Sequence, residues 1–67
     1  MKLTLNGDEY ELSSETPTVA DLVRALGLGK QAVAVEVNKR LAPKREHVST
    51  VLKDGDVVEV VTLVGGG

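Results

Sequence analysis

Polar and apolar residues alternate at the start of the chain, over residues 2–6 and again over residues 10–12, with a Gly-Asp pair at positions 7 and 8 between the two runs. Alternation with a period of two is typical of a half-buried strand, and a glycine between two such runs is typical of a tight turn. The pattern therefore predicts an N-terminal β-hairpin whose Leu3 and Leu5 side chains face the core.

The spacing of apolar residues then becomes helical. The positions i, i+3, i+4 and i+7, which share one face of a helix, are occupied by Val19, Leu22, Val23 and Leu26. Thr18 precedes this run as a candidate N-cap, and Asp21, three residues later, can complete a capping box. Gly27 can end the helix in a left-handed conformation. We expect one amphipathic helix between these two signals.

A third strand is predicted over residues 32–37, which are rich in β-branched side chains. Val33, Val35 and Val37 share one face of this strand, whereas Glu36 marks the opposite face. Because the run is so strongly apolar, we expect it to pair with neighbours on both sides.

Two further strands are predicted in the last third of the chain. Residues 41–43 fit only a short edge strand, because Pro43 has no N–H to donate to a ladder. Residues 44–50 predict a short helical turn. A Lys-Asp-Gly-Asp turn at 53–56 then leads into a long, Val-rich strand over residues 56–64.

The order strand, strand, helix, strand, short strand, strand predicts an α+β fold of the β-grasp type, with a mixed sheet of four to five strands packed on one helix. One helix covers only one sheet face. On the last strand Glu59 marks the exposed side, which assigns Val57, Val61 and Leu63 to that side and Val58, Val60 and Thr62 to the core. The exposed three are either ordinary surface residues or a surface that binds a partner protein.

Length and composition limit the classes of function. A chain of 67 residues has room for one domain, which we assign to residues 1–63, with residues 64–67 as a flexible glycine tail. With no Cys and a single His it predicts no disulfide and no metal site. A net charge of −2 argues against nucleic-acid binding, and the short apolar stretches argue against a membrane span. We expect a cytoplasmic protein.

Three consecutive glycines, Gly65, Gly66 and Gly67, are the candidate chemical feature. Without Cβ atoms they can thread a narrow channel and present a main-chain carboxylate to a partner's active site. The rest of the chain has no Cys nucleophile, no activated Ser–His pair and no phosphate-binding glycine loop. The glycines are therefore either the reactive end of the protein, a frayed terminus or a cloning remnant.

Several segments together resemble the ThiS sulfur carrier family of thiamine biosynthesis. They are Val-Glu-Val-Asn at 35–38, Pro-Lys at 43–44, Val-Leu-Lys-Asp-Gly-Asp-Val-Val-Glu-Val-Val at 51–61 and the three glycines, with a generic helix match at 18–22 and 26–28. The resemblance covers nearly the whole chain. It departs from the family pattern at Lys39, where Gly is usual in a tight turn after Asn38, at Lys44, where Arg is usual, and at His47, where Trp is common. Asn38 itself tolerates the left-handed conformation of such a turn.

The resemblance implies a ubiquitin-like fold and a protein that is a substrate of other enzymes, not an enzyme and without a bound cofactor. A ThiF-like adenylating enzyme would use ATP and Mg to join the carboxylate of Gly67 to AMP. Sulfur from a cysteine desulfurase, or from another donor, would then give a thiocarboxylate, which the thiazole synthase ThiG would consume. Partner contacts would involve the exposed side of the last strand with Val64, and a basic cluster of Lys39, Arg40, Lys44 and Arg45.

The basic cluster holds half of the chain's eight Lys and Arg residues. It is either a solvated loop or a patch that steers association with an acidic partner surface. His47 is expected to be a surface or packing residue, since a lone His has no catalytic partner.

Three alternative functions stay open at this point. The first is a MoaD-like carrier for molybdopterin synthesis, which shares the fold and the glycine end but is usually longer. The second is a TGS-type non-covalent binding module, which the glycines argue against. The third is a ubiquitin-like tag that is conjugated to protein lysines.

Overall fold

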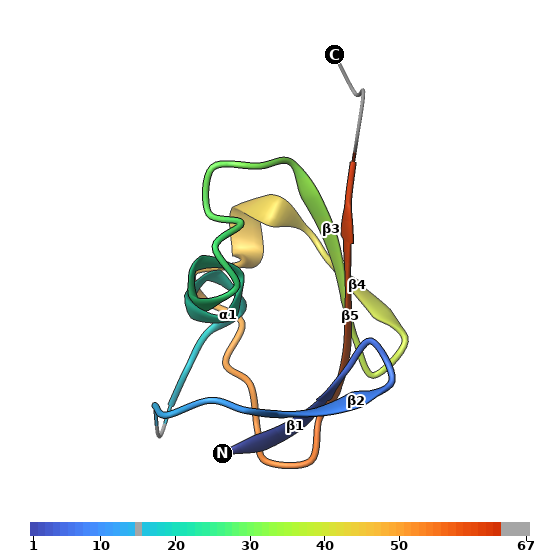
Figure 1. The fold of residues 1–67 in the computed structure, drawn as a ribbon. Coiled ribbons are helices and arrows are strands. Elements are labelled where there is room, and N and C mark those ends of the chain that lie inside the picture. The colour runs from blue at the N-terminus through green and yellow to red at the C-terminus, as the bar shows by residue number, and fades with distance from the viewer. Residues whose placement is uncertain (15, 64–67) are drawn as a thin grey trace.

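The computed structural model describes residues 1–14 and 16–63. One mixed sheet has the strand order β2-β1-β5-β3-β4, and a single α-helix lies across one of its faces (Figure 1). The neighbours β1 and β5 are parallel, and the other pairs are antiparallel. The elements in chain order are β1 (Lys2–Leu5), β2 (Asp8–Glu11), α1 (Val19–Ala25), β3 (Val33–Val37), β4 (Arg40–Ala42), the 3₁₀ helix η1 (Lys44–Glu46) and β5 (Val57–Thr62).

Two tight turns connect the antiparallel pairs β1–β2 and β3–β4, and both use left-handed residues. The β1–β2 turn is formed by Asn6 (φ 50°) and Gly7 (φ 88°), and the β3–β4 turn by Asn38 (φ 52°) and Lys39 (φ 69°). Two consecutive positive φ values are the geometry of a type I′ turn, whose twist matches that of the strands. Asn38 thus adopts the left-handed conformation expected of it, and Lys39 adopts one where a side chain is disfavoured.

Helix α1 begins and ends at the predicted signals. The Thr18 hydroxyl accepts a hydrogen bond from the Asp21 N–H (3.2 Å), and the Asp21 carboxylate accepts one from the Thr18 N–H (2.8 Å), which completes the capping box. The hydrogen bond from the Thr18 backbone, followed by that from its hydroxyl, lowers the pKa of the Asp21 carboxyl. Gly27, with φ 78°, follows the helix C-cap at Leu26.

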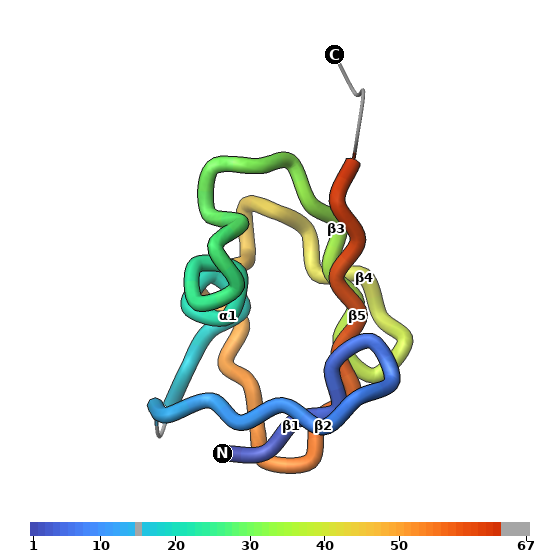
Figure 2. The backbone as a smooth tube through the Cα atoms, in the orientation of Figure 1, coloured from blue at the N-terminus to red at the C-terminus, as the bar shows by residue number. Residues whose placement is uncertain are grey.

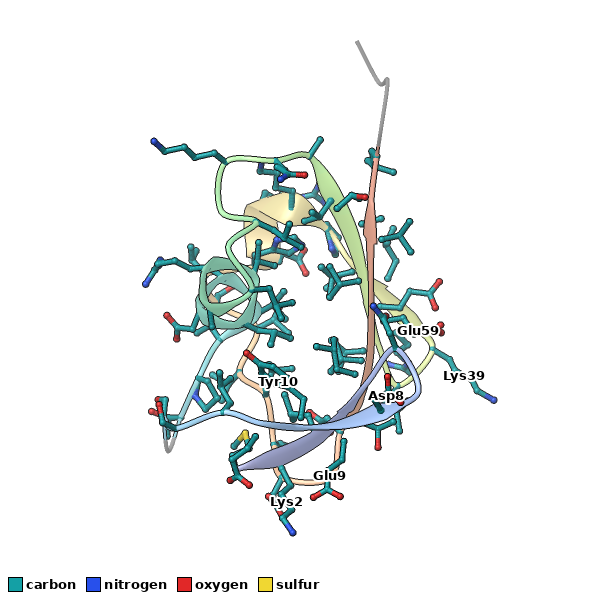
Figure 3. All side chains as sticks on the ribbon, viewed as in Figure 1. Lys2, Asp8, Glu9, Tyr10, Lys39 and Glu59 are labelled. Atoms are coloured by element: carbon teal, nitrogen blue, oxygen red, sulfur yellow. The ribbon has the colours of Figure 1, made fainter. Side chains whose placement is uncertain are left out.

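The core lies between α1 and the inner face of the sheet, and Tyr10 of β2 points into the same space (Figure 3). Alternate residues of the strands supply the sheet half of the core, as the alternation predicted. The helix contributes its predicted apolar face. The buried apolar residues are Leu3, Leu12, Val19, Leu22, Val23, Val33, Val35, Ala42, Leu52, Val58 and Val60.

The segment between η1 and β5 runs beneath α1 to the opposite end of the molecule (Figure 2). It is attached to the start of the helix by main-chain hydrogen bonds, from the Val19 N–H to the Thr50 carbonyl (2.9 Å) and from the Ala20 N–H to the His47 carbonyl (3.0 Å). These carbonyls satisfy N–H groups that have no partner within the helix itself. Leu52 then enters the core, and β5 begins after the predicted turn.

The element boundaries differ from the prediction by a few residues. The third strand begins at Val33, the edge strand is Arg40–Ala42, and the long strand is Val57–Thr62, with residue 64 outside the described residues. Pro43 caps η1, and only three residues of the predicted turn at 44–50 are helical. Among the helices of the described residues, none has the length and apolar character needed to cross a membrane.

Candidate partner-binding face

The sheet face turned away from α1, here called the outer face, exposes apolar side chains. Val57 (45% exposed), Val61 (57%) and Leu63 (51%) lie on it, as predicted from the position of Glu59. Val58 and Val60 point to the core. Figure 3 shows Glu59 on the side of β5 away from the helix.

The strand register shows which residues of the neighbouring strands share this face with those of β5. Ala34 of β3 pairs with Val61, Glu36 pairs with Glu59, and Leu41 of the edge strand pairs with Glu36. Leu41 is 66% exposed. These five residues line a shallow groove of about 270 Å³. The outer face is therefore apolar with two carboxylates near its centre.

Two asparagine side chains hold β5, the strand that leads to the glycines, on both flanks. From the β1–β2 turn, Asn6 donates to the Val60 carbonyl (3.1 Å) and accepts from the Val60 N–H (2.8 Å). From the β3–β4 turn, Asn38 accepts from the Val57 N–H (2.9 Å) and donates to the Asp56 carboxylate (3.0 Å). Asn6 therefore acts as one more rung of the sheet beyond the end of β1, because it pairs with both main-chain groups of Val60. Asn38 pairs with one main-chain group of β5 and with a side chain directly before that strand.

Sequence reasoning identified Asn38 as a turn residue but did not find either side-chain role. The available signal was an asparagine at positions 6 and 38, since asparagine is common in tight turns and tolerates a left-handed conformation. That signal fixes the backbone conformation of a turn. Which main-chain groups lie within reach of the amide depends on the placement of β5 in the sheet.

The basic cluster is divided by the fold. Lys39 and Arg40 lie at the β3–β4 turn, whereas Lys44 and Arg45 lie in η1, at the other end of β4 and beside α1 (Figure 1). All four are exposed. They form two separate basic pairs, so they do not present one continuous patch.

His47 is buried, with 6% of its surface exposed, and its Nε2 donates to the Ala42 carbonyl (2.9 Å). Because a carbonyl only accepts, Nε2 carries the proton. The ring lies at the edge of a cavity of about 200 Å³ between α1 and η1, which Arg24 and Lys44 also line. This confirms a packing role for His47.

The predicted reactive residues Gly65, Gly66 and Gly67, and the predicted contact residue Val64, lie outside the described residues. Within residues 1–14 and 16–63 there is no group of three His, Cys, Asp or Glu side chains that could hold a metal ion. The arrangement that is described offers a rigid body, an apolar outer face and a central strand that runs toward the glycines.

Comparison with known proteins identifies the family. The model of the ThiS family matches residues 3–67. The chain belongs to the ThiS family. This ThiS-family chain is 38% identical over 65 residues to the sulfur carrier protein ThiS of Bacillus subtilis (strain 168), covering 97% of the chain and 98% of the relative.

A second relative of this ThiS-family chain is much longer. The chain is 40% identical over 67 residues to a thiazole synthase of Paramagnetospirillum magneticum, and the match covers all of the chain but 20% of the relative. The chain thus spans a fifth of that thiazole synthase.

Solved structures confirm the fold of the ThiS-family chain. The crystal structure of the thiamine biosynthesis protein ThiS from Geobacter metallireducens superposes with a TM-score of 0.84 at 35% identity, and the match covers 100% of both chains. The prediction of a ubiquitin-like β-grasp fold is therefore confirmed, with five strands in the sheet.

Proposed function

We propose that this chain is a sulfur carrier of thiamine biosynthesis and that the carboxylate of Gly67 is the group that carries sulfur. The observation that supports this most directly is the match to Bacillus subtilis ThiS over 98% of that protein's length. The family match also extends through residue 67, so it includes all three glycines.

The proposed chemistry has two displacement steps. A carboxylate oxygen of Gly67 attacks the α-phosphorus of Mg-ATP on a ThiF-like adenylating enzyme, and pyrophosphate leaves. The resulting acyl adenylate has AMP as a good leaving group, which the free carboxylate lacks. A sulfide donor displaces AMP at the acyl carbon and gives the thiocarboxylate directly. The persulfide of a cysteine desulfurase displaces AMP to give an acyl disulfide, and a thiol then reduces its S–S bond, which releases the thiocarboxylate and leaves a disulfide on the donor side.

A thiazole synthase is the proposed acceptor of the sulfur. The relative of Paramagnetospirillum magneticum, which is named a thiazole synthase, contains a segment similar to the entire chain. Joining a carrier to its acceptor in one polypeptide raises their effective concentration. We infer that this carrier and a separate thiazole synthase act on the same sulfur.

The outer face is the proposed docking surface for the partner enzymes. Val57, Val61 and Leu63 lie on or directly after β5, next in sequence to the residues that would enter a partner's active site. Burying such exposed apolar area stabilises a complex by about 25 cal/mol per Å² before the costs of association. The inner core residues keep the strand rigid beneath this face.

Mass spectrometry tests the proposed chemistry. Incubation with ATP, a ThiF-like enzyme and a sulfur source should shift the intact mass by one oxygen-to-sulfur exchange. Deletion of Gly67 should abolish the shift and leave the circular dichroism spectrum unchanged, because the core is built from residues between Leu3 and Val60. An active enzyme preparation that produces no shift in the full chain would contradict the proposal.

A charge placed on the outer face tests the docking surface. Val61→Asp should reduce the rate of loading about tenfold or more, because it desolvates a carboxylate in an apolar interface. Val48→Asp is the matched control, since Val48 is even more exposed but follows η1 at the edge of the cavity beside α1. Equal effects of the two substitutions would show that the outer face has no special role.

Salt dependence tests the two basic pairs separately. Lys39→Gln with Arg40→Gln, and Lys44→Gln with Arg45→Gln, each remove two exposed positive charges from one site. If one pair steers association, its removal should lower the association rate at low salt and flatten its salt dependence. The other pair serves as the control of equal charge.

A further inference from the structure

Glu36 and Glu59 form an unusual pair on the outer face. They stand directly opposite one another on the antiparallel strands β3 and β5. Like charges at directly opposed positions of a sheet destabilise it. Within the part of the chain that the structure describes, the ion pairs are Met1–Glu11, Lys2–Glu9 and Arg24–Asp21, so no cation in that part neutralises either carboxylate.

The surroundings of the pair are apolar. Ala34 and Val61 lie on one side along the two strands, and Leu41 lies on the edge strand beside Glu36. Together with the two carboxylates they line the groove of about 270 Å³. Both glutamates are exposed, and the repulsion between their like charges is relieved when a cation binds between them.

The groove has the chemistry of an arginine side chain. A guanidinium group offers five N–H donors in a planar fork and can bind two carboxylates at once, while its methylene stem packs on apolar side chains. A lysine ammonium is a more strongly hydrated point charge and matches this pair less well. Two carboxylates alone are also fewer ligands than a divalent cation takes from a protein site.

We propose that a thiazole synthase binds the outer face by inserting one arginine side chain into this groove, with its guanidinium between Glu36 and Glu59 and its stem against Leu41 and Val61. This inference rests on the proposed function, because it assumes that the acceptor enzyme docks on the outer face. The arginine accounts for how the synthase recognises this carrier. The apolar residues provide contact area, and the acidic pair selects a surface that carries a matching arginine.

Calorimetric titration of the full chain with the thiazole synthase tests the inference without any sulfur transfer. Glu36→Gln and Glu59→Gln keep the shape of the groove and remove the charges, and each should raise Kd about tenfold. The double variant should raise it further and weaken its salt dependence. Glu46→Gln, an equal charge change at an exposed position in η1, should change Kd by less than about twofold.

Stability measurements on the same variants exclude unfolding as the cause. Removing a like-charge repulsion should leave the double variant at least as stable as the unmodified protein toward urea. A double variant with the Kd of the unmodified protein would overturn the proposal, even if sulfur loading proceeds normally. Failure of loading with intact, charge-dependent binding would instead overturn the proposed function.

Substitution on the enzyme identifies the occupant. The synthase arginines and lysines that complex formation protects from chemical modification are replaced by Gln one at a time. One arginine should weaken binding when replaced, and its replacement should have no effect on Kd once Glu36 and Glu59 are neutral. If the coupled residue is a lysine, the arginine assignment is wrong. Sedimentation of the carrier alone should show a monomer, and self-association lost in the double variant would show that a second copy occupies the groove.

Discussion

The β3–β4 turn allows the contribution of the Asn38 amide to be separated from that of its backbone conformation. Asn38 and its neighbour Lys39 are both left-handed, at φ 52° and 69°. Of these two residues, only Asn38 makes side-chain hydrogen bonds with other described residues, one with the Val57 N–H and one with the Asp56 carboxylate. Asn38→Gly and Lys39→Gly therefore place the same residue at two left-handed positions, and we expect opposite effects on the free energy of unfolding.

The magnitudes follow from these contacts. At Lys39, glycine relieves a left-handed strain of about 1–2 kcal/mol, which stabilises the folded protein. Glycine also increases the entropy of the unfolded chain, which costs about 0.5–1 kcal/mol of stability. The free energy of unfolding should therefore rise by roughly 0.5–1 kcal/mol. At Asn38 the strain is smaller because asparagine tolerates this conformation. Two exposed hydrogen bonds of about 0.5–1 kcal/mol each are lost, so the free energy of unfolding should fall by about 1 kcal/mol.

Thermal unfolding followed by far-ultraviolet circular dichroism suits this chain, which has no Trp and one Tyr. For a domain of this size, 1 kcal/mol corresponds to a shift in Tm of about 4–8 °C. The Tm of Lys39→Gly should therefore lie above that of the unmodified protein, and the Tm of Asn38→Gly should lie below it. If Asn38→Gly is as stable as Lys39→Gly, the amide does not hold β5 and the reasoning fails.

Three further predictions concern the helix, its cap and the buried imidazole. Leu22→Ala should lower the free energy of unfolding by about 2–5 kcal/mol in urea titrations, because Leu22 is fully buried between α1 and the sheet; a loss below 1 kcal/mol would contradict this packing. The lowered pKa of Asp21 means that its stabilising effect is present above the unfolded pKa and lost as pH falls through the folded pKa. Asp21→Asn should thus cost stability at neutral pH and progressively less in acid, and a pH-independent difference would refute the assigned cause. His47→Ala should lower the free energy of unfolding by about 1–3 kcal/mol, because the hydrogen bond to the Ala42 carbonyl and the packing of the ring are lost. His47→Gln retains an N–H donor and should recover part of this free energy.

The sequence alone determined the local elements because each rests on interactions between near neighbours in the chain. The capping box of Thr18 and Asp21 and the stop at Gly27 are local hydrogen-bonding and backbone effects, and the structure confirms them. The alternation around Glu59 assigned Val57 and Val61 to the exposed side of β5, since successive residues of a strand must face opposite sides. The resemblance to the ThiS family likewise depended on sequence alone.

Only the tertiary structure decided what distant segments do to one another. The register between β3 and β5 sets Glu36 opposite Glu59, and neither residue alone indicates that pairing. The parallel placement of β5 beside β1 brings Val60 within reach of Asn6. Continuity in sequence suggested one basic cluster, but β4 separates Lys39 from Lys44 in space. Periodicity reports which face a residue occupies, whereas its partners across the sheet are set by long-range pairing that a single sequence does not encode locally.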